Sequence, residues 1–390
     1  MMKKQLLCLL AVLLSMTLTV WADSEKTLYA ISADAAGEAA VPVIRKELET
    51  RFDIYNRLFR FELSGLSAPL NVRVFGEKAG YDRYVLERLG ETKEGALYFH
   101  YNQIERRELV IHYSETENAV TRAHQSFIQY LRAFIANPPS WLLEGFAVYF
   151  SSLRVDAGGK ADYEENQSWL EAVKNLGEKM PSPETVFLAD LGPAGMLPAG
   201  SNNEEFQITS WALVSFLLGS SRDYFRTLTD SFMLLSPNAG AAENTLLLAK
   251  RFTPWNDIET LDRDFRHYLD SRKTYRELVE EGRGAYARGD FMNAELSFLN
   301  AMDQHPSEYV PYYYLGLLSY EGKDYEQADK YYLAGLERGA GEALINYAMG
   351  INAAAAGRGQ TARYLLQKAA ALEPARYGTR VEELLKKIGQ

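Results

Sequence analysis

Cysteine is almost absent from this chain. Its only cysteine, Cys8, lies in an apolar segment (residues 6–20) that follows two lysines and ends shortly before Ala22 and a polar stretch. This arrangement is typical of a secretory signal peptide with a small residue at its cleavage site. We therefore predict a signal peptide at residues 1–22, and a mature chain with neither a disulfide nor a thiol nucleophile.

Basic residues are fewer than acidic ones, and long apolar runs are scarce. The chain has 42 lysines and arginines against 52 acidic residues, which gives a formal net charge of -10. This charge argues against nucleic acid and anionic lipid as partners. Beyond the leader, no segment approaches the roughly 18 unbroken apolar residues of a membrane helix, so we expect no stable membrane anchor after cleavage. A periplasmic or secreted protein is expected.

What the sequence does contain is an internal repeat with a period of 34 residues near the C-terminus. Small residues and large apolar residues recur at this spacing, in three sets: Gly282, Gly316 and Gly350; Ala294, Ala328 and Ala362; Phe298, Tyr332 and Leu366. Small residues let paired helices approach while large ones fill the space between them. The repeat therefore predicts an all-α C-terminal domain.

The segments GDFMNAELSF and GKDYEQADKYY resemble the turn and second helix of tetratricopeptide repeats. The resemblance implies three repeats over residues 273–375 and a capping helix over residues 376–390. Within the last segment, glutamates lie early and lysines late, as the helix dipole favours.

In the tetratricopeptide family, the first helix of each pair lines a concave groove. The repeat period places Tyr286, Tyr313, Tyr320 and Tyr347 at such positions. A groove lined by tyrosines suits an extended protein or peptide partner. The alternative is that some of these rings fill the core between repeats, and the sequence favours neither interpretation.

Residues 23–272 contain no repeat and mix two kinds of segment. Helical spacing of apolar residues predicts a helix over residues 41–59, and alternation predicts a strand over residues 69–76. Residues 96–102 and 108–114 are rich in aromatic and β-branched residues, which predicts paired strands. The sequence thus indicates an α+β domain.

Two helices separated by prolines follow these strands. The first is predicted over residues 118–135 and ends at Pro138-Pro139, and the second begins with Ser140 as its expected N-cap. Further on, residues 188–205 combine glycine and proline without periodicity and predict a long loop.

The order of these elements, together with the pattern W-L-x-E-G-x-A-x-Y in the second helix, resembles the gluzincin zinc metallopeptidases. The likeness is to the bacterial peptidase-MA-like group, which is often followed by tetratricopeptide repeats. It implies a metallopeptidase-like domain over residues 23–272, mostly helical with a small sheet. In that family the first helix carries H-E-x-x-H, whose histidines bind zinc from one helix face while the glutamate activates water. The second helix supplies a glutamate as the third ligand.

The corresponding motif here is H-Q-S-F-I, from His124 to Ile128. Gln125 stands at the general-base position, where a neutral amide cannot take a proton from water. Ile128 stands at the second ligand position and has no lone pair. His124 and Glu144 remain as the only motif ligands, and two ligands should bind zinc weakly because catalytic sites use three. Phe206 aligns where many relatives carry a tyrosine, so that possible oxyanion donor is absent too.

Two interpretations of His124 and Glu144 follow. They either belong to a functional zinc site or, as we favour, are a vestigial pair on an apolar helix face, buried and hydrogen-bonded to each other or to the backbone. The strand histidines His100 and His112 are conceivable replacement ligands, although their spacing gives no support. His267 and His305 are expected at the surface.

The leading hypothesis is an exported, non-catalytic pseudopeptidase that binds a protein or peptide partner and needs no cofactor. The alternative is an active zinc metallopeptidase with an atypical ligand set. A third hypothesis assigns all binding to the repeats and makes the front domain a rigid support.

Overall fold

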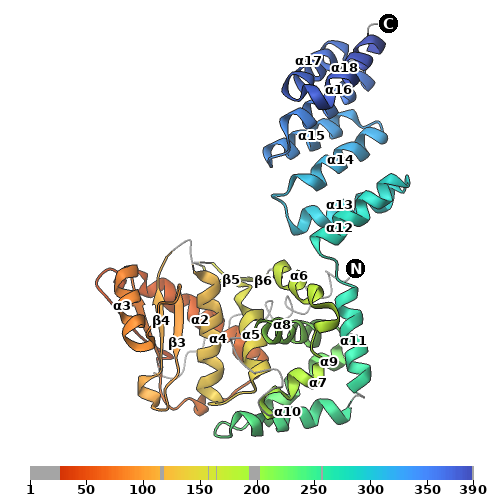
Figure 1. Ribbon diagram of the computed structural model, residues 1–390. Coiled ribbons are helices and arrows are strands. Elements are labelled where there is room, and N and C mark those ends of the chain that lie inside the picture. The colour runs from red at the N-terminus through yellow and green to blue at the C-terminus, as the bar shows by residue number, and fades with distance from the viewer. Residues whose placement is uncertain are drawn as a thin grey trace. The chain divides into compact units, whose positions relative to one another are not determined.

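The computed structural model describes residues 27–114, 118–156, 158–163, 165–192, 203–255 and 258–388. The predicted signal peptide and most of the predicted loop over residues 188–205 lie outside these ranges. Contacts within the chain divide it into two units, a first unit that ends at Asp270 and a second unit that begins at Ser271. Figure 1 shows the elements of each unit.

The first unit contains a four-stranded mixed sheet with strand order β1-β2-β4-β3. The strands are β1 (Tyr29–Ala33), β2 (Leu70–Phe75), β3 (Ala96–Phe99) and β4 (Glu108–His112). Strands β1 and β4 run parallel to β2, whereas β3 pairs antiparallel with β4. The predicted strand at 69–76 and the predicted strand pair are confirmed, but β1 was not predicted.

Different helices cover the two faces of this sheet. Helices α2 (Val41–Phe59) and α4 (Ala119–Phe134) pack against one face, where Val72 and Leu109 join Phe52 and Phe127 in the main core. Helix α3 (Lys78–Leu89) covers part of the other face, and its Tyr81 packs against strand residues there. Figure 1 shows these three layers. Burial alternates along β2 because successive side chains point to opposite faces.

The remaining elements of the first unit are mostly helical. They are the β5–β6 hairpin (Leu153–Val155 and Ala161–Tyr163), α5 (Ser140–Ser151), α6 (Gln167–Leu176), α7 (Pro183–Phe187), α8 (Glu204–Gly219), α9 (Arg222–Ser231), α10 (Ala241–Trp255) and α11 (Ile258–Asp270). Short 3-10 turns are η1 (Glu38–Ala40), η2 (Leu63–Gly65), η3 (Ile104–Arg106), η4 (Gly177–Lys179), η5 (Ala189–Leu191) and η6 (Phe232–Leu234). Helix α5 packs between α4 and α8.

The start of α5 differs from the sequence prediction. Ser140 is the first residue of the helix, and Pro139, which has no capping hydrogen bond, takes the N-cap position. Asp190 of η5 caps the helix from outside: it accepts hydrogen bonds from Ser140 N at 2.8 Å and from Ser140 Oγ at 2.5 Å. A carboxylate satisfies the free N–H groups at a helix start and is favoured by the dipole. Thr245 Oγ1 of α10 holds the same carboxylate at 2.8 Å.

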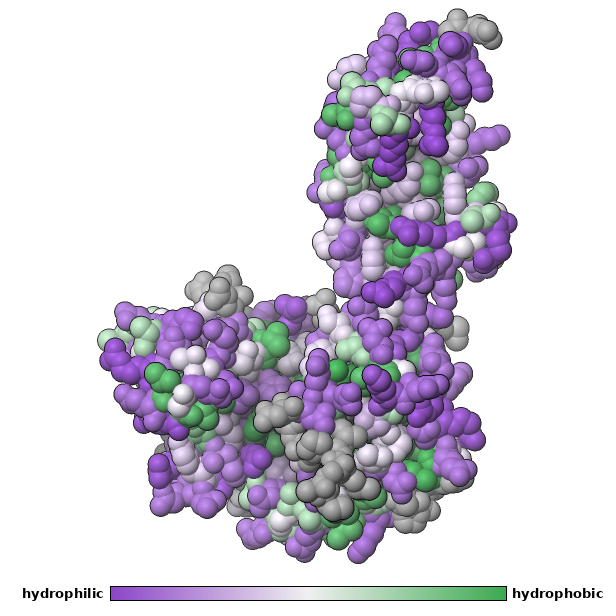
Figure 2. Space-filling view, in the orientation of Figure 1, coloured by the Kyte–Doolittle hydropathy of each residue, from purple (hydrophilic) through white to green (hydrophobic). Residues whose placement is uncertain are grey.

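The second unit consists of three helical hairpins followed by one more helix. The hairpins are α12–α13 (Tyr275–Ala287 and Phe291–Gln304), α14–α15 (Tyr309–Glu321 and Tyr325–Glu337) and α16–α17 (Glu342–Ala355 and Gly359–Leu372), and the last helix is α18 (Pro374–Ile388). Proline suits the first position of α18 because no amide hydrogen is needed there. In Figure 2, hydrophobic residues appear only as scattered spots on this unit, which buries its apolar side chains between helices.

The 34-residue period corresponds to a repeated contact inside each hairpin. A Cβ atom on Gly316 would lie 2.4 Å from the Tyr332 ring, and a Cβ on Gly282 would lie 2.7 Å from the Phe298 ring. The third hairpin repeats this approach with its own glycine and a leucine. Each hairpin thus needs a glycine where its second helix presses a large side chain against the first.

Candidate functional site

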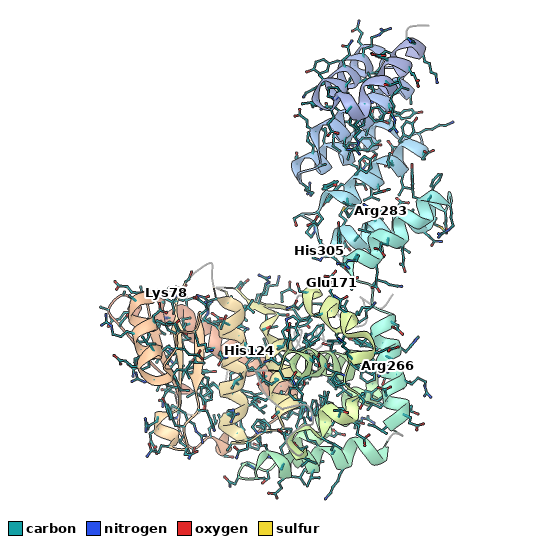
Figure 3. All side chains as sticks on the ribbon, viewed as in Figure 1. Lys78, His124, Glu171, Arg266, Arg283 and His305 are labelled. Atoms are coloured by element: carbon teal, nitrogen blue, oxygen red, sulfur yellow. The ribbon has the colours of Figure 1, made fainter. Side chains whose placement is uncertain are left out.

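The residues of the degenerate motif lie on two helices that pack against each other. His124, Gln125 and Ile128 belong to α4, and Glu144 belongs to α5. His124 and Ile128 are four residues apart and share one face of α4. Figure 3 labels His124 on this helix.

His124 is a neutral imidazole in a low-dielectric environment. Burial lowers the pKa of His124 to about 4, because the charged form loses its hydration. Its Nδ1 lies 3.3 Å from Gln125 Nε2, so the ring can accept a hydrogen bond from the neighbouring amide. The imidazole is therefore uncharged at neutral pH.

Gln125 is committed at both ends of its amide. While Nε2 contacts His124, Oε1 accepts a hydrogen bond from Tyr98 N at 2.9 Å. Tyr98 lies on β3, the edge strand of the sheet, and the outward side of an edge strand leaves backbone N–H groups unpaired. Gln125 therefore ties α4 to the sheet edge.

Glu144 does not bond to His124. Its side chain accepts a hydrogen bond from Gln207 Nε2 of α8 at 3.1 Å, and within the described part of the chain no hydrogen bond or ion pair joins it to His124. The residue is only 6% exposed. Burial raises the pKa of Glu144, and Gln207 and Arg132 partly offset this rise. Hydrogen bonding between the two motif residues, which we considered from the sequence, is not seen, because α8 supplies the partner instead.

A cation from α4 reaches the same region. Arg132 lies two turns beyond His124. Its positive charge offsets part of the rise that burial causes in the pKa of Glu144, and it adds to the fall that burial causes in the pKa of His100. His100 directly follows β3, and burial is the main reason that its pKa falls to about 4. Its Nδ1 is buried and has no hydrogen-bond partner within the described residues. Arg132 thus lies within electrostatic reach of both His100 and Glu144.

The other histidines lie elsewhere. His112 ends β4 and packs near the Tyr81 ring of α3, with ring centroids 6.1 Å apart, on the face of the sheet away from α4. His267 of α11 is exposed, as expected. His305 was expected at the surface but is partly buried, because its ring meets the Tyr275 ring edge-on at 4.9 Å.

The residues at the motif do not fit a zinc ion. Ile128 packs against the main core, and Phe206 is fully buried in α8 without a polar atom to offer. Within the described residues, no three or more His, Cys, Asp or Glu side chains form a group that could hold a metal ion. A divalent cation bound by His100 and Glu144 would also be repelled by Arg132.

The four tyrosines singled out in the repeats all lie on first helices of the hairpins: Tyr286 on α12, Tyr313 and Tyr320 on α14, and Tyr347 on α16. Each is partly buried and packs against the apolar clusters between helices. Three of them, Tyr286, Tyr313 and Tyr320, lie close enough to Tyr332 to raise its pKa, which burial already raises. The rings therefore contribute to the core, as the second sequence interpretation holds, and their place in a partner groove stays a prediction.

Sequence reasoning missed Tyr377 of α18. Its ring stacks on Tyr347 with centroids 4.7 Å apart, and Arg376 lies over it at 5.1 Å. The phenol oxygen is buried without a hydrogen-bond partner in the described residues. Tyr377 lies beyond the last repeat, so the 34-residue period could not place it.

Comparison of the chain with models of known protein families, with curated proteins and with solved structures gives no match. In the part of the chain that the structure describes, no helix combines the length and the apolar character required to span a bilayer.

Proposed function

We propose that this chain is an exported, non-catalytic relative of the gluzincin peptidases that binds a protein or peptide partner through a tetratricopeptide module. The observation that carries the proposal is the state of Gln125. Its amide is used by Tyr98 and His124, so neither a base nor a free acceptor stands at the catalytic position. Loss of a general base alone typically costs about 10²- to 10⁴-fold in rate.

One observation favours the alternative of an active zinc enzyme with an atypical ligand set. His124 and His100 are both neutral at pH 7, and His100 Nδ1 has an unused lone pair or proton. A catalytic zinc site would need these two histidines and Glu144 as its three ligands, but the three side chains do not form a metal-holding group in the described part of the chain. The charge of Arg132 beside two of these three groups opposes that arrangement.

Metal analysis of the purified mature chain separates the two functions. We expect zinc well below one equivalent and no chelator-sensitive peptide hydrolysis. The matched variants are Glu144→Ala, which removes the motif ligand, and Arg132→Gln, which removes the cation. One equivalent of zinc together with peptide cleavage, both lost in Glu144→Ala, would end the non-catalytic proposal.

Partner binding by the repeats is tested in the full chain. In pull-downs from the native organism, the double substitution Tyr313→Ser/Tyr320→Ser should abolish capture of a specific protein. Tyr364→Ser is the control, because this tyrosine is 65% exposed but lies on α17, a second helix. If capture survives the double substitution and is lost in Arg132→Gln, the partner binds the first unit, and the assignment to the repeats is wrong.

Export is part of the same proposal. The predicted signal peptide should be removed after Ala22, so N-terminal sequencing of the protein recovered from outside the cytoplasm should begin at Asp23.

A further inference from the structure

A second candidate site lies on the sheet face that carries α3, away from the α4 face. It is a groove of about 520 Å³. Its floor includes Ser32 of β1 and Asn71 and Arg73 of β2, and its walls include Arg88 of α3 and Arg106 of η3. Ligand sites for small molecules have volumes of roughly 300–1,000 Å³. The groove forms because α3 covers the sheet only in part and leaves β1 and the adjoining part of β2 open.

Three guanidinium groups from three different elements line this groove, and aromatic rings hold each of them. Arg88 lies over the Tyr84 ring at 3.4 Å from its centroid, and Arg73 lies 5.1 Å from the same centroid. Arg106 lies over the Tyr101 ring at 4.6 Å. Stacking restrains the planar guanidinium while its in-plane N–H groups stay available for bidentate contacts.

Of the three cations, only Arg73 is hydrogen-bonded to a carboxylate, while Arg88 makes a longer ion pair with Glu87 at 3.8 Å. Glu108 accepts a hydrogen bond from Arg73 Nε at 3.1 Å and another from the Tyr84 hydroxyl. The carboxylate of Glu108 is therefore already paired with these two groups. Glu105 also lines the groove and is exposed, as are Arg88 and Arg106.

The other two arginines keep uncommitted donors. Arg88 donates from Nη1 to Tyr84 O, and the carboxylate that it approaches, Glu87, is 3.8 Å away. Arg106 donates from Nη1 to Gln103 Oε1 at 3.3 Å and has no ion pair within the described residues. In a chain with a formal net charge of -10, two ring-stacked guanidiniums that line one groove and are hydrogen-bonded to no carboxylate indicate a site for negative charge.

We propose that this groove binds a small oxyanion ligand, a compound that carries carboxylate or phosphate groups, with Arg88 and Arg106 as its principal contacts. Guanidinium groups pair with both kinds of oxyanion through two parallel hydrogen bonds. Arg73, fixed by Glu108, completes the positive side of the groove. The proposal is independent of the function proposed for the α4–α5 helix pair.

The experiment is calorimetric titration of the full mature chain with two probes, inorganic phosphate and citrate. We expect saturable binding of at least one probe. Arg88→Gln and Arg106→Gln should each weaken it about 10-fold, which corresponds to about 1.4 kcal/mol, and the double variant should show no binding. Arg83→Gln is the matched control, because Arg83 is exposed on the same α3 helix and does not line the groove.

Each outcome decides the proposal. Binding of phosphate alone supports the site and indicates a phosphate ester, whereas binding of citrate alone supports it and indicates a polycarboxylate. The proposal is overturned if the unmodified chain binds neither probe at millimolar concentration, or if Arg83→Gln weakens binding as much as the groove variants do. Circular dichroism checks the fold of each variant, and Arg106→Gln on the short η3 turn keeps the test valid if Arg88→Gln fails to fold.

Discussion

At the scale of single residues, the α4–α5 site depends on which polar atoms are already paired. Gln125 joins the edge strand to α4, and Gln207 holds Glu144 from α8. Both contacts join segments far apart in sequence. A motif in the sequence identifies which residue types are present, but it cannot show that an amide from another helix is the partner of a buried carboxylate.

Restoring one ligand tests whether His124 still points toward a metal position. In Ile128→His, a second imidazole lies one turn from His124, and Glu144 is the third ligand. We expect zinc affinity to rise at least about 10-fold, because the ligand count reaches that of catalytic sites. Competition with a fluorescent zinc chelator measures the affinity.

Two variants control this experiment. Ile128→Leu keeps the apolar packing and should leave zinc affinity unchanged, and Ile128→His/Glu144→Ala should lose most of the gain. Equal zinc affinity in Ile128→His and Ile128→Leu would mean that α4 no longer presents His124 as a ligand.

The free energy of unfolding depends on pH because the pKa of His124 differs between the folded and the unfolded chain. Its pKa is about 4 in the folded chain, against an ordinary value of 6.5. Above pH 6.5 neither state is protonated and the residue adds no pH dependence. As the pH falls from 6.5 to 4, the unfolded chain binds the proton first, so the folded state loses stability. The pKa of His100 is also lowered to about 4, so protonation of His100 in the unfolded chain likewise reduces stability as the pH falls.

We expect the loss of unfolding free energy between pH 7 and pH 5 to shrink by about 2 kcal/mol in His124→Gln, since the titrating group is gone. Urea denaturation with a chelator present measures it. His267→Gln is the control, because this histidine is exposed on α11. Identical pH dependence in His124→Gln and the unmodified chain would show that His124 titrates normally.

At the scale of elements, the sequence predicted some features well and others not at all, for physical reasons. Helix α2 and the hairpins of the second unit were predicted because their apolar residues repeat within a few turns or at a fixed period. Strand β1 was missed, since its short sequence YAISA has little apolar alternation and is defined by its parallel pairing with β2. The cap of α5 was assigned wrongly because Asp190 lies 50 residues away along the chain.

The residues of the candidate sites also differ in how far the sequence could predict them. His124, Gln125 and Glu144 could be singled out from a local motif. Arg132 lies outside the motif, two turns further along α4, and His100 joins that region only through the packing of α4 beside β3. The arginine groove could not be predicted either. Its three cations come from β2, α3 and η3, and no spacing along the chain connects these elements.

The close approach in the second hairpin predicts a steric effect. In Gly316→Ala the new methyl group would lie 2.4 Å from the Tyr332 ring, which is 1% exposed and cannot move aside. Overpacking of this kind costs about 1–3 kcal/mol, which should exceed the gain in helix propensity of about 1 kcal/mol. Chemical denaturation should therefore show a less stable second unit.

Gly378→Ala is the matched comparison in the same unit. Gly378 lies within α18, and a Cβ atom added to it would have no neighbouring atom within 4 Å. Only the higher helix propensity of alanine then acts, so this substitution should raise the free energy of unfolding of the second unit by up to about 1 kcal/mol. If Gly316→Ala lowers the free energy of unfolding and Gly378→Ala raises it, the hairpin contact is supported as the reason for the repeated glycine. A stabilising effect of Gly316→Ala would contradict it.

At the scale of the whole molecule, the chain combines an overall negative charge with a local positive groove. A formal net charge of -10 disfavours contact with polyanionic surfaces such as nucleic acid. A groove that restrains arginines on aromatic rings can still select a small anion, because short-range bidentate hydrogen bonds act where the net charge is screened. The expected ligand of the groove is therefore small.

The division into two units gives the last prediction, which concerns additivity. Asp190→Ala removes the acceptor at the start of α5 in the first unit and should cost about 1–2 kcal/mol there. Gly316→Ala acts in the second unit. Substitutions far apart without shared partners usually add within about 0.3–0.5 kcal/mol. In calorimetry, each single variant should lower one transition only, and the double variant should lower both by the amounts seen separately. A Gly316→Ala variant that lowers the transition affected by Asp190→Ala would show that the two units unfold as one, because a change confined to one independent unit cannot alter the melting of the other.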